Sequence, residues 1–200
     1  MQKKKLTRLR KKLEEIHCGA KLLMQVLDRG SMLYTKGFYI AYILFKSQII
    51  EYLIEEIIKL NEDIINLHLK KSMFKAMTLS VNKPLGYSKL NLERVLKDKS
   101  IIKDIEKFNK IRIEAMHRII KSKQSIKKTE KEMKKYIDNE GEKTKLAERL
   151  LCIYLKATAE WIEQLIKNSK LKEKEKSVIN EAILNFKNPE KYFKRKLNKK

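Results

Sequence analysis

Residues 101–120 read IIKDIEKFNKIRIEAMHRII, and this stretch has the periodicity of one long amphipathic helix. Its apolar side chains recur at steps of three and four residues, the spacing of one helix face; they are Ile101, Ile105, Phe108, Met116 and Ile119. Arg112 interrupts this pattern, because at about 100° per residue it falls in the middle of the apolar arc. A guanidinium there must be paired or directed at an anion, since an unpaired buried charge is costly.

His117 follows Arg112 by five residues, about 140° around the helix and roughly 7.5 Å along its axis. We expect it at the edge of the same face. Glu51 and Glu55, in the apolar segment that precedes this helix in the chain, are the carboxylates that we expect to pair with Arg112. An Arg inside an apolar face with a His beside it is the arrangement in this chain that most needs a chemical explanation.

The composition predicts an all-α domain. The chain has 200 residues, is 42% hydrophobic and contains only 5 Gly and 2 Pro, so it has enough apolar content for a core and few helix breakers. Runs of alternating β-branched residues are missing. We expect one helical domain over residues 1–170 (core about 34–168, with a helix over 6–28 packed on it) and a basic helical tail over 171–200.

Local signals set the expected ends of the elements. Gly30 suits a left-handed cap that ends the first helix, and Thr35 suits the cap of the next. That second helix is apolar most of the way round and should be buried, with a bend at 61–63 before it continues to 78. We expect a loop over 80–86, a short helix over 88–97 and the helix quoted above over 100–121. The capping-box spacing of Thr129 and Glu132, and Thr144 as a cap, predict two later helix starts.

The charge balance points to an anionic partner. Lys and Arg number 48 against 25 Asp and Glu, for a formal net charge of +23. A field of this size attracts polyanions, with nucleic acid the first candidate and an anionic membrane surface the second. The densest basic segment follows residue 120 and includes Lys121, Lys123, Lys127 and Lys128, the lysines that would track the backbone of a bound nucleic acid. The two isolated cysteines fit a reducing cytoplasm, and no apolar run suits a membrane span.

Three motifs carry a resemblance to a known family. Arg112-Ile-Glu-Ala-Met-His117 fits an R-x4-H pattern, and Phe108-Asn-Lys-Ile-Arg112 leads into it. Leu85-Gly-Tyr-Ser-Lys-Leu90 looks like the Leu-Gly-x-x-x-Leu turn that often precedes the short third helix. Over roughly residues 34–168 the chain therefore resembles HEPN (higher eukaryote and prokaryote nucleotide-binding) domains. Active members commonly carry a polar residue directly after the Arg, where this chain has Ile113 with Glu114 as the nearest polar replacement.

The resemblance implies an up-and-down bundle of four to five long helices that forms a homodimer with a shared basic cleft. It also implies a metal-independent endoribonuclease without a cofactor, as in toxins and phage-defence effectors. Arg112 would clamp the scissile phosphate and His117 would act as general acid or base, because RNA supplies its own 2′-hydroxyl nucleophile. The supporting residues would be Glu51, Glu55, Asn109 and Glu114. An antitoxin or a nucleotidyltransferase-like protein is a further candidate partner.

Three other interpretations stay open. The chain is a catalytically inactive HEPN-like protein that binds RNA or nucleotides or acts as a scaffold. Alternatively, Arg112 is one half of a buried ion pair with a glutamate, and His117 is a hydrogen-bonded residue at the edge of the core. The third is a di-metal bundle, because the chain contains two Glu-x-x-His motifs; its ligands would come from Glu14, His17, Glu114 and His117 with two of Glu51, Glu55, Glu148 and Glu160.

Overall fold

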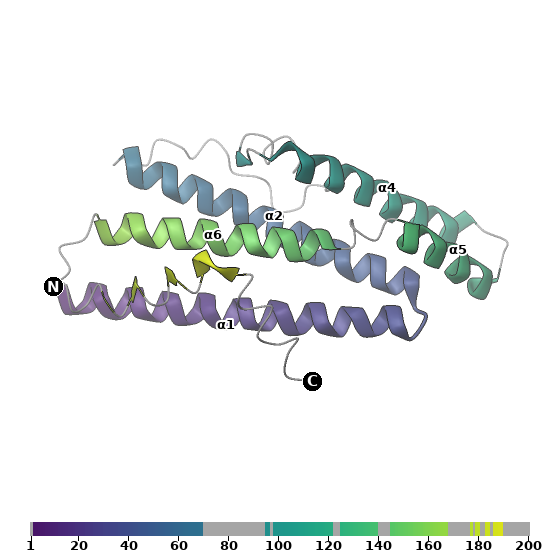
Figure 1. Ribbon diagram of the computed structural model, residues 1–200, viewed down its shortest axis with the longest axis horizontal. Helices are drawn as coiled ribbons and strands as arrows, with labels where there is room; N and C mark the ends of the chain where they lie inside the picture. Colours follow the sequence, from purple (N-terminus) through teal and green to yellow (C-terminus); the bar gives the residue numbers. More distant parts are fainter. Residues whose placement is uncertain are drawn as a thin grey trace. The chain divides into compact units, whose positions relative to one another are not determined.

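The computed structural model describes residues 2–69, 95–96, 98–121, 125–139, 145–167, 177, 179–180, 183–184 and 186–189. The long helices among these residues are α1 (Gln2–Thr35), α2 (Tyr39–Leu69), α4 (Lys99–Lys121), α5 (Ile126–Asn139) and α6 (Leu146–Lys167) (Figure 1). The described residues contain no strand, so the prediction of an all-α helical bundle is confirmed. None of these helices is both long and apolar enough to cross a membrane.

The backbone contacts divide the chain into two compact units, each built from separate segments of the sequence. The first unit comprises Met1–Leu22, Glu56–Thr78 and Leu151–Lys200. The second unit comprises Leu23–Glu55 and Leu79–Leu150. Residues 171–200, expected as a tail, therefore group with the first unit, whereas α4 and α5 lie wholly in the second.

The first unit is built around the apolar face of α6. Its buried side chains there include Tyr154 and Trp161. The C-terminal segment adds a second apolar row at helical spacing, in which Ile179, Ile183 and Phe186 are at most 3% exposed. Lys187 Nζ lies 2.5 Å from Glu163 Oε1. The segment expected as a basic tail thus buries apolar side chains at these three positions.

A Schellman turn joins α1 to α2 in the second unit. Phe38 N–H donates to Leu33 O at 2.9 Å and Gly37 N–H donates to Tyr34 O at 3.0 Å, the two bonds of that motif. Gly37 has a φ of 83°, a left-handed conformation that favours glycine. The predicted stop at Gly30 is therefore wrong, because α1 continues to Thr35.

Thr35 and Gly30 have roles that differ from the predicted ones. The Thr35 hydroxyl donates to Met32 O at 3.0 Å inside the last turn of α1, so it does not cap α2. Gly30 is buried within α1 beside the ring of Phe45. A Cβ on Gly30 would lie only 2.7 Å from Phe45 Cε1, so glycine is needed here for close approach rather than for its φ.

The second helix runs without a break through the predicted bend. Residues 61–63 are helical, because polar side chains on a partly exposed surface do not interrupt the backbone bonds of a helix. Most of its apolar side chains are buried, as expected, although Phe38, just before its start, is 53% exposed. The predicted loop over 80–86 lies outside the described residues, as do Thr144 and nearly all of the predicted helix over 88–97.

The next two helices begin at short polar residues. Asp98 caps α4, since its Oδ1 accepts the backbone N–H of Ser100 at 2.9 Å. Lys128 N–H and Thr129 N–H both donate to Ser125 O, at 3.0 and 3.2 Å, and α5 starts directly after Ser125. The predicted capping box at Thr129 is wrong, because Thr129 lies inside α5, where it is only 3% exposed.

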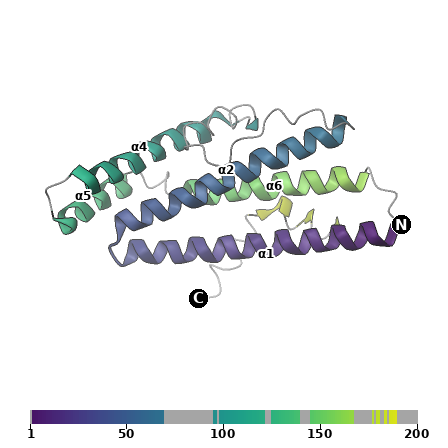
Figure 2. The ribbon, with the colours of Figure 1, turned by 180° about the vertical axis from the view of Figure 1, so that it is seen from behind.

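Two polar contacts hold α5 against the α1–α2 turn, and α5 lies beside α4 in both ribbon views (Figures 1 and 2). Glu130 Oε2 accepts the backbone N–H of Ile40 at 2.9 Å, so α5 supplies a cap for the N-terminus of α2. The Tyr34 hydroxyl donates to Asp138 Oδ1, and this bond raises the pKa of Tyr34 to about 12. Thr129, Met133 and Ile137 form the buried face of α5.

Gly30→Ala is expected to destabilise the protein, because overpacking costs about 1–3 kcal/mol and the gain in helix propensity offsets at most about 1 kcal/mol. Gly19→Ala is the matched control in the same helix, since a Cβ there meets nothing within 4 Å. That control should stabilise the protein by about 0.5–1 kcal/mol. Urea unfolding measures both changes. Phe45→Leu should restore part of the stability lost by Gly30→Ala, and two alanine variants of equal stability would contradict the close contact.

Candidate functional site

The buried face of α4 differs from the predicted stripe in its second half. Ile101, Ile105 and Phe108 are buried as predicted. Beyond them, the buried positions are Ile111 and Ala115, whereas the predicted Met116 is 39% exposed. The side chain of Ile119 lies outside the described part. The buried arc therefore rotates away from Met116 toward the C-terminus of α4, which moves Arg112 from the centre of the arc to its flank.

Arg112 is paired within the chain. Its Nη1 donates to Glu51 Oε1 of α2, and their side chains are 21% and 35% exposed. The prediction that a glutamate of α2 pairs with Arg112 is therefore confirmed for Glu51. Glu55, one turn further along α2, is half-buried and has no ion pair in the described part of the chain. The two side chains are only partly exposed to solvent. Loss of Glu51 would therefore leave the Arg112 guanidinium poorly solvated and without a counter-charge.

His117 is exposed and does not lie at the edge of the Arg112 face, so that expectation is wrong. Five residues turn the helix by about 140°, and the rotation of the buried arc places His117 nearly opposite it. Within one chain, the imidazole and the guanidinium are therefore directed to different sides of α4.

The other predicted supporting residues do not join the Arg112–Glu51 pair. Asn109 is half-buried, and its Oδ1 has no hydrogen-bond partner in the described part of the chain. Glu114 is half-buried and is engaged in another interaction. The sequence thus predicted Arg112 and its glutamate partner, but not which other residues surround this ion pair.

The described residues contain no group of three or more His, Cys, Asp or Glu side chains placed to hold a metal ion. Two of the glutamates named for a di-metal site have other partners. Glu51 binds Arg112, and Glu148 Oε1 accepts from Lys46 Nζ at 2.7 Å. The side chain of His17 lies outside the described part, and Glu114 and His117 are not joined by two further carboxylates.

Lys46 is a buried cation that the sequence reasoning did not assign. Its side chain is 4% exposed, its Nζ bonds Glu148, and the same Nζ lies 5.6 Å from the centroid of the Tyr42 ring. A lysine in the middle of an otherwise apolar helix was the signal for such a pair, because a buried ammonium requires a partner.

Arg149 forms a further internal cluster at the start of α4. Its guanidinium donates to Asp104 Oδ2 and, at 3.1 Å, to Ser100 Oγ. Asp98 Oδ2 lies 3.9 Å from Arg149 Nη2. Hydrogen bonds from Ser100, with the nearby Arg149 charge, lower the pKa of Asp98 below its ordinary value. The cluster joins the cap of α4 to the first residues of α6.

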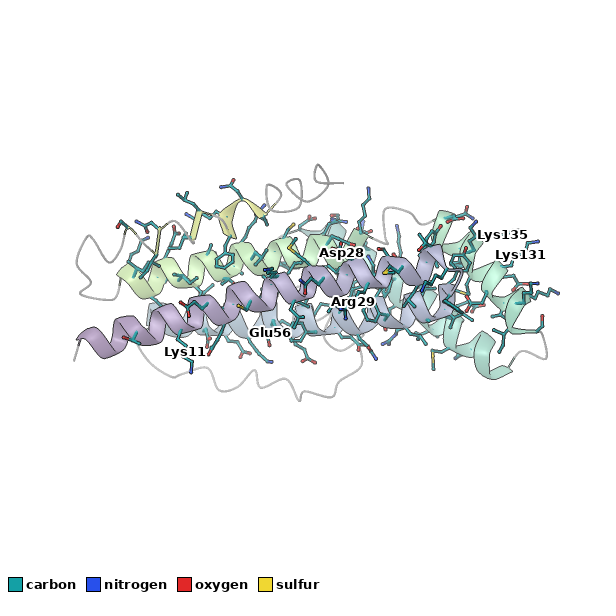
Figure 3. All side chains as sticks on the ribbon, turned by 90° about the horizontal axis from the view of Figure 1, so that it is seen from below. Lys11, Asp28, Arg29, Glu56, Lys131 and Lys135 are labelled. Atoms are coloured by element: carbon teal, nitrogen blue, oxygen red, sulfur yellow. The ribbon has the colours of Figure 1, made fainter. Side chains whose placement is uncertain are left out.

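Lysines cover the outer side of α5. Five of its fourteen residues are exposed lysines that fall within about 120° of the helix surface, opposite the buried Thr129, Met133 and Ile137. We call this set the α5 lysine face: Lys127, Lys128, Lys131, Lys134 and Lys135. Lys131 and Lys135 extend away from the ribbon (Figure 3). The predicted RNA contacts Lys127 and Lys128 belong to this face, whereas the side chains of Lys121 and Lys123 lie outside the described part.

The outer side of α4 carries a second basic row, the α4 lysine face, which consists of Lys99, Lys103, Lys107 and Lys110. All four side chains are exposed. His117 shares this arc, since it follows Lys110 by seven residues, or nearly two turns. No ion pair to any lysine of the two faces occurs within the described part of the chain. The arrangement can bind phosphates, and His117 belongs with that surface rather than with Arg112.

No protein-family model, curated protein or solved structure matches this chain. The resemblance to HEPN domains therefore rests on the motifs of the sequence alone.

Glu51→Gln is expected to lower the stability by about 1–3 kcal/mol, because it leaves the half-buried Arg112 without its counter-charge. Glu55→Gln is the matched control on the same helix and should change the stability by less than about 0.5 kcal/mol. Thermal unfolding of both variants checks this difference. Equal effects would show that the Arg112–Glu51 bond contributes nothing to the fold.

Proposed function

We propose that this protein binds RNA through the α4 and α5 lysine faces and does not cleave it. The observation that carries the proposal is the separation of charge in the second unit. Its carboxylates at positions 51, 104, 130, 138 and 148 bond to groups inside the unit. The lysines of both faces are exposed and have no such partner in the described residues.

A surface of this kind favours a polyanion on physical grounds. Each lysine that meets a phosphate releases condensed counterions from the nucleic acid, and this release supplies most of the affinity in sequence-independent binding. A membrane surface fits less well, because a helix that binds lipid inserts an apolar face. The apolar face of α5 is buried within the protein. The exposed Cys18 and half-buried Cys152 are free thiols, in keeping with the reducing cytoplasm that we propose as the compartment.

Cleavage by an Arg112–His117 pair is the less favoured function. Arg112 is held by Glu51, and His117 points to another side of α4, so a single chain does not present both groups to one phosphate. These contacts support the inactive HEPN-like binding module over the ribonuclease. The predicted toxin or phage-defence role, the homodimer and the antitoxin or nucleotidyltransferase-like partner stay predictions.

The combined substitution of Lys127, Lys131 and Lys135 by Gln should weaken RNA binding about tenfold or more near 0.1 M salt. The slope of log affinity against log salt should fall by about two to three, because three phosphate contacts are lost. Fluorescence anisotropy over a series of salt concentrations measures both quantities on a labelled RNA.

The matched control removes three exposed lysines of the first unit, with Lys21, Lys156 and Lys167 changed to Gln. It has the same net charge as the α5 variant. If long-range attraction alone governs binding, the two variants will weaken it equally. A selective loss in the α5 variant, with unchanged thermal unfolding, supports a local contact.

Wild-type protein incubated with total RNA in EDTA is expected to leave the RNA intact, because no single chain presents both catalytic groups. Gel electrophoresis of the RNA measures whether it is cleaved, and the variants Arg112→Ala and His117→Ala are tested in parallel. Cleavage by the wild type that both variants abolish would overturn the binding-only proposal and restore the ribonuclease. Cleavage that is equal in all three proteins would indicate a contaminating nuclease.

A further inference from the structure

We infer that the two lysine faces recognise the phosphate backbone of a double-stranded nucleic acid, without reading its bases. This inference rests on the proposed function and names the class of nucleic acid that the surface takes. It follows from which side chains the faces contain, how they are spaced and where the exposed aromatic rings lie.

The first step is the chemistry of the two faces. The cations described on them are all lysines, which contact phosphates as point charges with rotatable donors. Bases in duplex grooves are read by Arg or Lys at guanine and by Asn or Gln at adenine, and among these Lys alone lacks a planar pair of donors or acceptors. Arg112 and Arg149 bond to carboxylates within the second unit. The one nearby amide on the flank of α4, Asn109, is half-buried with its Oδ1 turned away from solvent.

The second step concerns stacking. Proteins that hold single strands place bases on exposed aromatic rings, and each stacked base contributes about 1–3 kcal/mol. No aromatic ring lies on either lysine face among the described residues. The exposed Tyr136 of α5 is 43% exposed, but it lies about 140° around the helix from the middle of the lysine arc. An unpaired strand would therefore leave its bases unstacked on this surface.

The third step is charge density. Lys127, Lys131 and Lys135 follow one another at about 6 Å along the axis of α5, and Lys99, Lys103, Lys107 and Lys110 form a similar row on α4. Rows on helices have a fixed spacing, so a flexible strand must lose conformational freedom to lie along them, whereas a duplex is already stiff. A duplex carries about one charge per 1.7 Å of its length, roughly twice the density along one of its strands, and it releases more counterions per contact. Fixed rows of point charges therefore gain most from a duplex.

Two glutamates lie close to the α4 row and do not remove its charge. Glu106 and Glu114 are half-buried on the outer side of α4, and each is engaged in an interaction of its own. On α5, Asp138 accepts from Tyr34 and Glu130 accepts from Ile40. These bonds leave the carboxylates charged, but the lysines outnumber them, with four against Glu106 and Glu114 on α4 and five against Glu130, Glu132 and Asp138 on α5, so both faces keep a net positive charge.

The test compares four labelled ligands with the intact protein by anisotropy. They are a 20-base-pair RNA duplex, a DNA duplex of the same sequence, an RNA duplex of unrelated sequence, and an unstructured 40-nucleotide single-stranded RNA with a matched number of phosphates. Duplex RNA is expected to bind at least about tenfold more tightly than the single strand, and the two RNA duplexes should agree within about threefold. Equal affinity for the DNA duplex assigns recognition to phosphates alone, whereas a preference for duplex RNA assigns it to phosphates in A-form geometry.

The outcomes separate the two proposals. Single-stranded RNA that binds as tightly as duplex, or more tightly, overturns the inference but leaves RNA binding standing. A difference of more than about tenfold between the two RNA duplexes shows base readout and also overturns it. Absence of binding to all four ligands overturns the proposed function itself. Lys131→Gln with Lys134→Gln should weaken duplex binding, and the same two-charge loss at Lys156 and Lys167 should change it far less.

Discussion

Five carboxylates of the second unit are bonded to groups inside the unit, and its surface chemistry depends on this arrangement. Glu51 holds Arg112, Glu148 holds Lys46 and Asp104 holds Arg149. Each bond neutralises a cation that would be expensive to leave unpaired away from water. These carboxylates do not form ion pairs with the exposed lysines described on α4 and α5. The contacts that neutralise the buried cations therefore leave the surface of the unit basic.

The organisation into helices could be predicted from the sequence because it depends on local periodicity. The apolar steps of three and four residues predicted the helix over 100–121 within one residue of α4, and the apolar content of the second helix predicted that α2 is buried. The pairing of Arg112 with a glutamate of α2 could be predicted as well, because a guanidinium in an apolar arc requires a counter-charge. Neither inference needed knowledge of how distant segments meet.

The wrong predictions concern positions where distant segments decide the outcome. Gly30 resembles a helix stop in the sequence, but its neighbour is the ring of Phe45, fifteen residues away. The first turn of α2 needed a cap, and the sequence suggested the adjacent Thr35, whereas the structure uses Glu130 from α5. His117 was expected beside Arg112 because the buried arc of α4 was treated as straight, but it turns along the helix. The R-x4-H spacing is therefore present in the sequence without bringing the two side chains together in one chain.

The cap that Glu130 provides links two parts of the second unit whose sequences are far apart. The backbone amide of Ile40 bonds to Glu130 only while α5 is docked, and the Tyr34 hydroxyl bonds to Asp138 only under the same condition. Detachment of α5 would thus expose the start of α2 to solvent exchange, and the two segments should open as one cooperative folding unit. A polyanion bound to the outside of α5 would stabilise the docked state of that helix. Hydrogen exchange at the Ile40 amide would consequently slow, although α2 does not contact the polyanion.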